Sequence, residues 1–199
     1  MKRGTKIGWF LIALSVILSV WVIVSQSSDA SQATESGLVL SDDGTVLEDY
    51  TGNGGAVTIP DGVTTINAGV FASKDITSVV MPSSVTSMGT GVFSGCTSLA
   101  SVSLISSLNG IPEETFRECL SLGSVTIPDS ATSIGSNAFY GCASLSSVSI
   151  PASVSSISTD AFSGCGNLSN ISVASGNGAY ASSDGCLYNA SKTRLLLVP

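Results

Sequence analysis

The chain has 199 residues, of which 43% are hydrophobic, 11% are charged and none is histidine. Without histidine there is no Ser–His or Cys–His pair, which excludes the usual machinery of nucleophilic hydrolases. The net charge of −7 becomes −9 beyond residue 30, where 4 basic and 13 acidic residues remain. We expect no nucleic acid partner, because such a surface repels phosphate.

The N-terminus has the layout of an export signal. Three basic side chains in the first six residues precede the uncharged segment 7–24, and small residues lead to a cleavage site after Ala30. The apolar segment counts 18 residues, which also reaches the length needed to span a bilayer. We predict one hydrophobic helix, with residues 1–30 forming either a cleaved signal peptide or an N-terminal membrane anchor. Both alternatives export the rest of the chain, to the extracellular space or the cell surface.

Residues 31–55 are predicted to form a spacer followed by an N-terminal cap. The segment 38–50, LVLSDDGTVLEDY, alternates apolar and polar residues on both sides of DDG, which is typical of a β-hairpin. The segments that follow are repetitive, and the first repeat of such an array needs a cap. Without one it would expose an apolar face and an unpaired strand edge.

A period of about 23 residues governs the chain from residue 56 to residue 173. Phenylalanine recurs at steps of 22, 23, 23 and 23, and cysteine follows three residues after each of the last four. Self-similarity at this period predicts a solenoid, in which each repeat is one coil and equivalent residues stack into ladders. The predicted core ladders are Phe71, Phe93, Phe116, Phe139 and Phe162, and Cys96, Cys119, Cys142 and Cys165.

The fourth repeat shows how one coil is expected to fold. Val125 and Ile127 alternate with polar neighbours, which predicts a short strand with one buried face, and Pro128 ends it. A second short extended segment follows near Ile134, and Gly141 suits the chain reversal after it. We count about five coils of 22–23 residues.

The tail, residues 174–199, breaks the period. Apolar runs at 186–188 and 195–198 flank a polar turn, so we expect a hairpin that caps the last coil. Cys186 lies in this tail, outside the ladder, and is the cysteine that we expect to be most reactive.

Five cysteines in an exported chain suggest either disulfides or buried thiols. Adjacent coils put equivalent Cα atoms ~4.8 Å apart, but in-register Cβ atoms are then farther apart than the ~3.8 Å that disulfides prefer. We favour a ladder of thiols that act as small apolar residues. Four cysteines along a line cannot surround one zinc ion, so neither a metal nor a cofactor is expected.

Two rows of small side chains are expected on the outward faces of the coils. They could contact a glycan or the edge of another protein, or they could form a solvated surface open to O-glycosylation. The candidate binding face is Ser103, Thr126, Ser149 and Ser172 in one row and Thr64, Thr86, Asn109, Thr132 and Ser155 in the other. The candidate N-glycosylation sites, each in an N-x-S sequon, are Asn167, Asn170 and Asn189.

Adjacent acidic residues are the remaining candidates for catalysis. Neighbours on a strand or turn point to different sides, so these pairs make poor acid–base dyads and no catalytic residue is predicted. The pairs are Asp42 with Asp43, Glu48 with Asp49, and Glu113 with Glu114.

The repeating unit is I-G-x-x-A-F-x-G-C-x-x-L-x-x-V-x-I-P, and it resembles the BspA-like leucine-rich repeat over residues 56–173. The resemblance implies an all-β leucine-rich-repeat solenoid with hairpin caps, preceded here by the N-terminal hydrophobic helix. It also implies a surface-exposed or secreted protein of bacteria, archaea or certain protists. Known members bind extracellular-matrix proteins or other cells, or have no assigned ligand. The family has no shared binding motif, so the resemblance assigns no binding residue.

These observations together favour a non-catalytic cell-surface or secreted protein that recognises an extracellular protein or glycan, in adhesion or in host or cell–cell interaction. Residues 7–24 would hold it in the membrane if they are not cleaved. The alternative is a structural spacer or coat component that associates with copies of itself.

Overall fold

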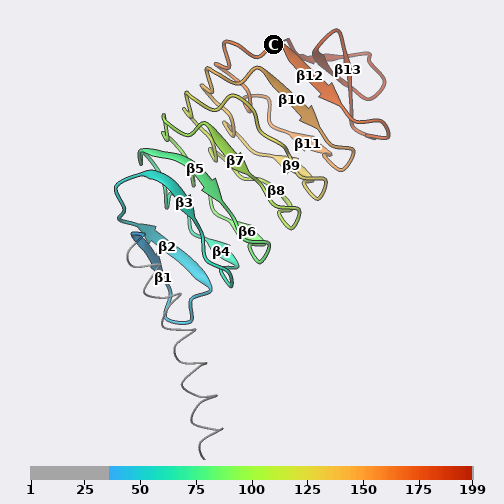
Figure 1. Cartoon of the computed structure of the whole chain (residues 1–199). Coiled ribbons are helices and arrows are strands. Elements are labelled where there is room, and N and C mark those ends of the chain that lie inside the picture. Colours follow the sequence, from blue (N-terminus) through green and yellow to red (C-terminus); the bar gives the residue numbers. More distant parts are fainter. Residues whose placement is uncertain (1–35, 199) are drawn as a thin grey trace, which may run out of the picture.

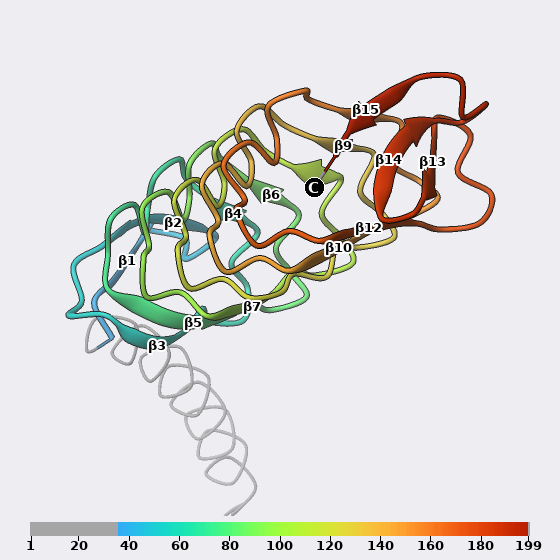
Figure 2. The same cartoon turned by 90° about the horizontal axis from the view of Figure 1, so that it is seen from above.

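The computed structural model of the protein describes residues 36–198, which form an all-β solenoid of about six turns (Figure 1). The hydrophobic helix, signal peptide or anchor predicted for residues 1–30 lies outside the described residues. Within residues 36–198, no helix is long and apolar enough to cross a membrane. Figure 2 shows the coils stacked in order, from β1 at one end to the C-terminal sheet at the other.

One face of the solenoid carries a row of short parallel strands, the first row. Equivalent residues of successive coils are paired, so that Val57 lies opposite Val79, and Val79 opposite Val102. All three are buried, because alternate residues of each strand point into the stack. The strands of the first row are β3 (Gly55–Thr58), β5 (Ile76–Val80), β7 (Ser101–Ser103), β10 (Ser147–Ile150) and β12 (Asn170–Val173).

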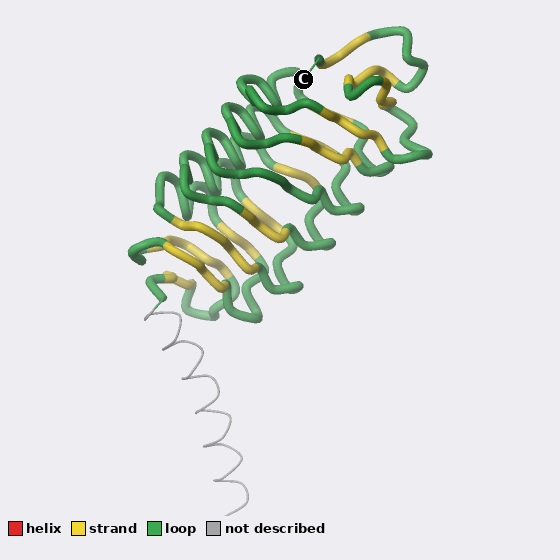
Figure 3. Tube along the Cα trace, turned by 45° about the horizontal axis from the view of Figure 1, so that its top comes forward, coloured by secondary structure: helices red, strands yellow, loops and turns green. Residues whose placement is uncertain are grey.

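A second row of even shorter strands lines another face, and turns make up most of each coil (Figure 3). Its first member is β2, which pairs in parallel with β4, placing Leu47 opposite Ile66. The prediction of about five coils was therefore low, because β2 joins the ladder although its sequence lies outside the 23-residue period. The strands of the second row are β2 (Val46–Tyr50), β4 (Thr65–Ile66), β6 (Ser87–Met88), β8 (Gly110–Ile111), β9 (Ser133–Ile134) and β11 (Ser156–Ile157).

The N-terminal cap is the predicted hairpin, formed by β1 (Leu38–Leu40) and β2. Its turn is held by Asp43, whose carboxylate accepts hydrogen bonds from the N–H and hydroxyl of Thr45 and from the hydroxyl of Ser41. These bonds, the Thr45 N–H foremost, lower the pKa of Asp43 to about 2. The turn is thereby closed by its own side chains.

A stack of phenylalanine rings runs through the core of the coils. The five rings are buried, and neighbouring centroids lie 5.2–5.5 Å apart with the ring planes within 17° of parallel. At the N-terminal end, Tyr50 covers Phe71 with a tilted ring at 5.2 Å, and its hydroxyl accepts a hydrogen bond from the N–H of Gly54. The cap thus continues the aromatic stack while giving the phenol oxygen a polar partner.

Three backbone hydrogen bonds join each of the first three phenylalanine turns to the next coil. The N–H of Phe116 donates to the carbonyl oxygen of Ala138 at 2.8 Å, and Glu114 and Glu118 donate in the same direction at 2.9 and 2.6 Å. The pattern recurs at the turns around Phe71 and Phe93. A coil alone cannot satisfy these donors, so each coil depends on its successor.

The C-terminal cap is a three-stranded antiparallel sheet, whereas the sequence predicted a two-stranded hairpin. It consists of β13 (Tyr180–Ser183), β14 (Cys186–Asn189) and β15 (Leu195–Leu197). The cap supplies acceptors to strand donors of the last coils. The hydroxyl of Tyr180 accepts the N–H of Ile157 at 2.8 Å, and the carbonyl of Gly185 accepts the N–H of Ile171 at 2.8 Å.

The strand predicted at 124–127 is not formed. Val125 and Ile127 are buried and their polar neighbours are exposed, as the alternation predicted, but no ladder pairs this segment with β7 or β10. The first row therefore consists of separate three- and two-stranded sheets. Alternating burial depends only on which side faces the core, whereas a ladder also requires aligned backbone groups.

Asn177 provides a test of the C-terminal cap. Its side chain donates to the carbonyls of Pro151 and Val154 and accepts the N–H groups of Ala179 and Tyr180. We expect N177A to lower the free energy of unfolding by about 2–3 kcal/mol, because backbone groups in a half-buried position lose their partners.

Urea denaturation of the full-length variants measures this effect. N109A is the matched control, because Asn109 is exposed, and it should stay within about 0.5 kcal/mol of the wild type. Equal midpoints for the two variants would show that Asn177 does not anchor the cap.

Gly141 and Ser73 test the backbone of the turn. They occupy equivalent positions in different coils, with φ of 70° and 57°. A Cβ on Gly141 would make only an ordinary contact, at 3.4 Å from the Glu118 side chain. G141A should therefore cost about 1–2 kcal/mol from left-handed strain alone, and S73G should stabilise by up to about 1 kcal/mol. Thermal unfolding of both variants measures the two signs, and a shift in the same direction would contradict the explanation.

Candidate recognition surface

The first predicted row of small side chains lies on the outward face of the first-row strands. Ser103 and Ser149 are exposed on β7 and β10, and Thr126 is exposed between those strands. Ser172 is half-buried, paired with Ser149 across β10 and β12, and donates to the carbonyl of Val148 at 3.5 Å. The structure brings this row onto one face, where the exposed Val80 of β5 lies opposite Ser103.

Hydroxyl groups of the second predicted row form hydrogen bonds between neighbouring coils. The hydroxyl of Thr86 donates to the carbonyl of Thr64 at 3.4 Å, and that of Thr132 donates to the carbonyl of Asn109 at 3.0 Å. Thr64 and Ser155 donate in the same way to the coil before them. These hydroxyls therefore use their protons within the protein and present lone pairs, so this face mainly offers acceptors to a ligand.

The second row is interrupted between β6 and β8, and the sequence gives the reason. In the coils on either side, the N–H of Gly89 donates to Ile66 and that of Gly135 donates to Ile111, both at 2.8 Å. Pro112 occupies the equivalent position in the third coil (residues 101–123) and has no N–H to donate to the coil before it. No ladder joins β6 to β8 in the described part of the chain.

A groove of about 360 Å³ lies over this interruption. Thr86 and Thr132, both members of the predicted binding face, line it from the neighbouring coils, and the exposed Asn109 lies between them. Gly110 and Ser133 also line the groove, and a Cβ on Gly110 would approach the Ser133 hydroxyl to 2.6 Å. Sequence analysis named the threonines but missed the groove, for which Pro112 was the available signal.

An aromatic and basic patch lies on the turn edge of the same coil. The guanidinium of Arg117 lies 5.4 Å from the ring centroid of Tyr140 in the following coil and 3.0 Å from the carboxylate of Glu118. Tyr140 is 38% exposed. Leu120, which belongs to the third coil like Arg117, is 46% exposed. The predicted binding face did not include Arg117 or Tyr140, although they are 23 residues apart, which is one coil.

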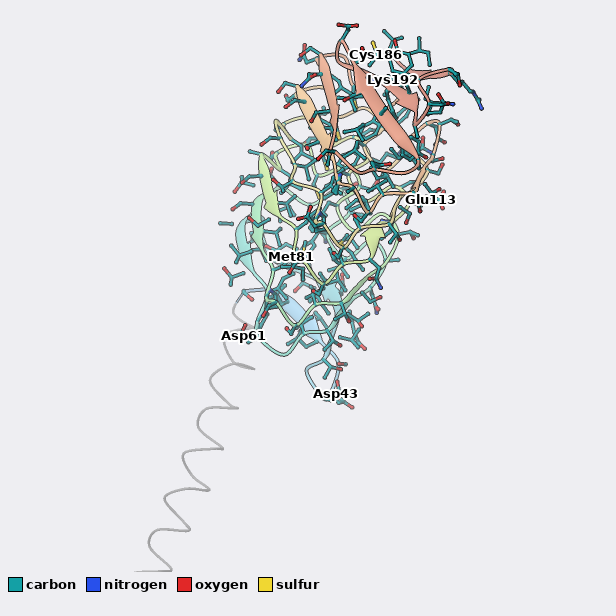
Figure 4. The ribbon with its side chains drawn as sticks, turned by 90° about the vertical axis from the view of Figure 1, so that its right-hand side faces the viewer. Asp43, Asp61, Met81, Glu113, Cys186 and Lys192 are labelled. Carbon is teal, nitrogen blue, oxygen red and sulfur yellow. The ribbon has the colours of Figure 1, made fainter. Side chains whose placement is uncertain are left out.

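The backbone of the third coil is strained in this region. Glu114 and Glu118 adopt φ of 55° and 57°, where glycine occupies the corresponding positions of the coil before it. Each such residue costs about 1–2 kcal/mol relative to its right-handed conformation. Glu113 lies at the same edge, on the opposite side of the stack from Asp61 (Figure 4). We call the groove residues Thr86, Asn109 and Thr132 and the patch residues Arg117, Leu120 and Tyr140 the third-coil surface.

The three sequons differ in their accessibility. Asn167 and Asn170 are exposed near the last coil, although the Asn167 amide donates to the carbonyl of Ala143 at 2.7 Å. Asn189 is half-buried, and its amide bonds the hydroxyls of Ser191 and Thr193. Asn170 is therefore the sequon whose side chain has the fewest competing contacts.

The ladder cysteines are free thiols that donate to backbone oxygens. Cys96, Cys119 and Cys142 are buried, and each Sγ lies 2.8–3.1 Å from the carbonyl oxygen of the phenylalanine one coil earlier. Burial raises the pKa of Cys96 to about 11 and that of Cys142 to about 12, and it raises the pKa of Cys165 as well. Such thiols are poor nucleophiles, because the reactive thiolate is scarce near neutral pH.

Cys186 lies apart from the ladder, in the C-terminal sheet (Figure 4). It is half-buried, and its thiol makes only a long contact, 3.7 Å, to the carbonyl of Asp184. Among residues 36–198, no group of three His, Cys, Asp or Glu side chains could hold a metal ion.

A family model described as "BspA type Leucine rich repeat region" matches residues 64–194 in six copies. A leucine rich cell surface protein from Faecalibacterium prausnitzii is 38% identical, with a TM-score of 0.64 over 69% of this chain and 37% of that one. The leucine rich repeat protein of T. pallidum is 34% identical, with a TM-score of 0.62 over 67% and 66%.

A third solved structure, a leucine-rich repeat protein from Eubacterium ventriosum, is 29% identical, with a TM-score of 0.67 over 81% of this chain and 48% of that one. This chain therefore spans less than two thirds of the length of each of these three proteins. None of the curated proteins compared matches the chain.

Thiol titration tests the cysteine ladder. In the folded protein at about pH 8, a disulfide reagent should label one of the five thiols rapidly, because the raised pKa and burial protect the other four. All five should react in urea, and C186S should abolish the fast reaction. Rapid labelling of several thiols in the folded protein would show that the ladder is open to solvent.

Proposed function

Since this chain belongs to the family of BspA-type leucine-rich repeat proteins, we propose that it is a non-catalytic module that recognises an extracellular protein or glycan. We further propose that residues 1–30 export it, so that the solenoid is displayed at the cell surface or secreted. The similarity to a protein described as a cell surface protein of Faecalibacterium prausnitzii supports this location.

The exposed Arg117–Tyr140 pair is the observation that carries this proposal. Tyrosine and arginine are enriched among the residues that dominate binding energy, and Tyr140 offers a flat apolar ring with a polar tip. The pair is already stacked at 5.4 Å, so binding would order few additional side-chain rotations. Leu120, exposed on the same turn edge, adds apolar area.

The groove over the interrupted second row complements this patch with polar groups. The Asn109 amide provides both donors and an acceptor, and the hydroxyl oxygens of Thr86 and Thr132 provide acceptors. Sugar hydroxyls and peptide backbones both present donors and acceptors that can pair with these groups. The third-coil surface therefore combines an apolar anchor with polar contacts for orientation, which is the composition of a recognition site.

The acidic balance of the chain narrows the class of ligand. Beyond residue 30 the net charge is −9, and Arg117 already contacts Glu118. Such a surface exerts little electrostatic repulsion on neutral glycans and on protein surfaces of modest positive charge, whereas it repels polyanions.

Binding measurements on full-length variants test the proposal. The probes are a glycan array and a panel of immobilised extracellular-matrix proteins. The amount of protein that binds to each probe is measured. We expect the double variant R117A/Y140A to lose about tenfold or more in affinity for the probe that the wild type selects, because it removes both hot-spot side chains.

S147A is the matched control, since Ser147 is exposed on the first-row face and should leave binding unchanged. Binding that survives in R117A/Y140A would overturn the role of the third-coil surface. Failure of the wild type to bind any probe, together with concentration-dependent self-association in sedimentation, would instead favour the structural spacer.

A further inference from the structure

Each of the first four phenylalanine turns in the array is covered by the coil that follows. Around Phe139, for example, its own N–H donates to the carbonyl of Ala161 and that of Gly141 donates to the carbonyl of Ser163, both at 2.8 Å. The ring of Phe139 stacks on that of Phe162 at 5.2 Å. An extended segment with one aromatic side chain thus satisfies the backbone and the ring together.

The last of these turns, residues 158–164, has no such cover. The N–H groups of Asp160, Phe162 and Gly164 donate to no backbone carbonyl among residues 36–198, whereas most of their counterparts in earlier coils donate forward. Within this part of the chain, the N–H of Asp160 contacts only its own carboxylate. The C-terminal cap supplies acceptors to strand donors, through Tyr180, Ser182 and Gly185. Three backbone donors at alternate residues are therefore available at this end of the stack.

A cavity of about 190 Å³ adjoins these donors. Phe162, which is covered by Phe139 on one side, lines it, and so do Leu187 and Leu195 of the cap. This volume exceeds the roughly 150 Å³ that holds a benzene ring in a protein interior, so an aromatic side chain fits.

Arg194 lines the same cavity and adds a positive charge. It is exposed and forms no ion pair within the described residues, where the single salt bridge joins Arg117 to Glu118. In a chain with 13 acidic and 4 basic residues beyond residue 30, an unpaired arginine beside an apolar cavity favours a ligand that carries a carboxylate.

We propose that the terminal turn is a second binding site, which takes an extended peptide segment of a partner protein as an additional turn of the solenoid. Carbonyl oxygens of the peptide accept the N–H groups of Asp160, Phe162 and Gly164. A large aromatic side chain enters the cavity and continues the phenylalanine stack, and a neighbouring carboxylate pairs with Arg194. Main-chain hydrogen bonds supply affinity, and the cavity supplies specificity, as in other cases of strand addition.

This site does not depend on the third-coil surface, which lies on a different coil. The occupant follows from the molecule itself, since residues 159–163 cover Phe139 in the same manner. That segment also contains an acidic residue, Asp160, two positions before its aromatic residue, and its charge is opposite to that of Arg194.

A synthetic peptide that copies residues 157–164 is the probe, titrated into the ¹⁵N-labelled full-length chain. We expect saturable chemical-shift changes at the amides of Asp160, Phe162 and Gly164. A peptide with alanine in place of its phenylalanine should bind about tenfold more weakly, because the buried ring is lost. Absence of saturable binding by the phenylalanine peptide would overturn the proposal, as would shifts confined to other coils.

Two pairs of exposed variants separate the site from non-specific adhesion. L195E places a negative charge at the cavity and should weaken the peptide about tenfold, whereas V80E, an equivalent change on the exposed first-row face, should have no effect. R194A should weaken it about threefold, whereas K192A, which alters a cap cation that does not line the cavity, should not.

Equal affinities within either pair would overturn the proposal. So would sedimentation showing that a second copy of the chain occupies the turn and excludes the peptide. R117A/Y140A should bind this peptide normally, so failure of the third-coil surface and failure of the terminal turn are distinguishable.

Discussion

The structure depends on hydrogen bonds and ring contacts that each coil can make only with its neighbours. A coil of some 23 residues buries its phenylalanine ring and satisfies the amide donors of its phenylalanine turn when the following coil is present, as the bond from Phe116 to Ala138 shows. Stability is therefore a sum of interfaces between adjacent coils rather than the property of one central core. The two ends of the stack require separate solutions, which Tyr50 and the C-terminal sheet provide.

Features that repeat at the period could be predicted from the sequence. The positions of Phe93, Cys119 and Leu145 in the core follow from their spacing, because stacked coils place equivalent residues in line. Features that arise from a single residue could not be derived in this way. Pro112 interrupts a ladder by lacking one hydrogen, and nothing in a hydrophobic pattern records a missing donor. The strand at 124–127 failed for the opposite reason, since its pattern is ideal but its backbone is not aligned with a neighbour.

The candidate surface was only half visible in the sequence for the same reason. Thr86 and Thr132 were identifiable because they recur, but both hydroxyl groups donate their protons to backbone carbonyls of the preceding coil. The aromatic patch required residues one coil apart to be read together, and the pairing of Arg117 with Tyr140 becomes evident only in register. Departures from the repeat gather in the third coil, in Gly110, Pro112 and the left-handed glutamates. A regular frame thus displays these residues in a fixed geometry.

The C-terminal cap has a consequence for the size of the molecule. Tyr180 and Gly185 contact only the last strands of each row, and the β1–β2 hairpin contacts only the first turn. The contacts of either cap therefore do not depend on how many coils lie between the two ends. Duplication or deletion of one 23-residue unit would lengthen or shorten the rod by a step of ~4.8 Å while leaving both ends intact. Evolution can therefore adjust the reach of such a molecule by whole increments, without redesigning its termini.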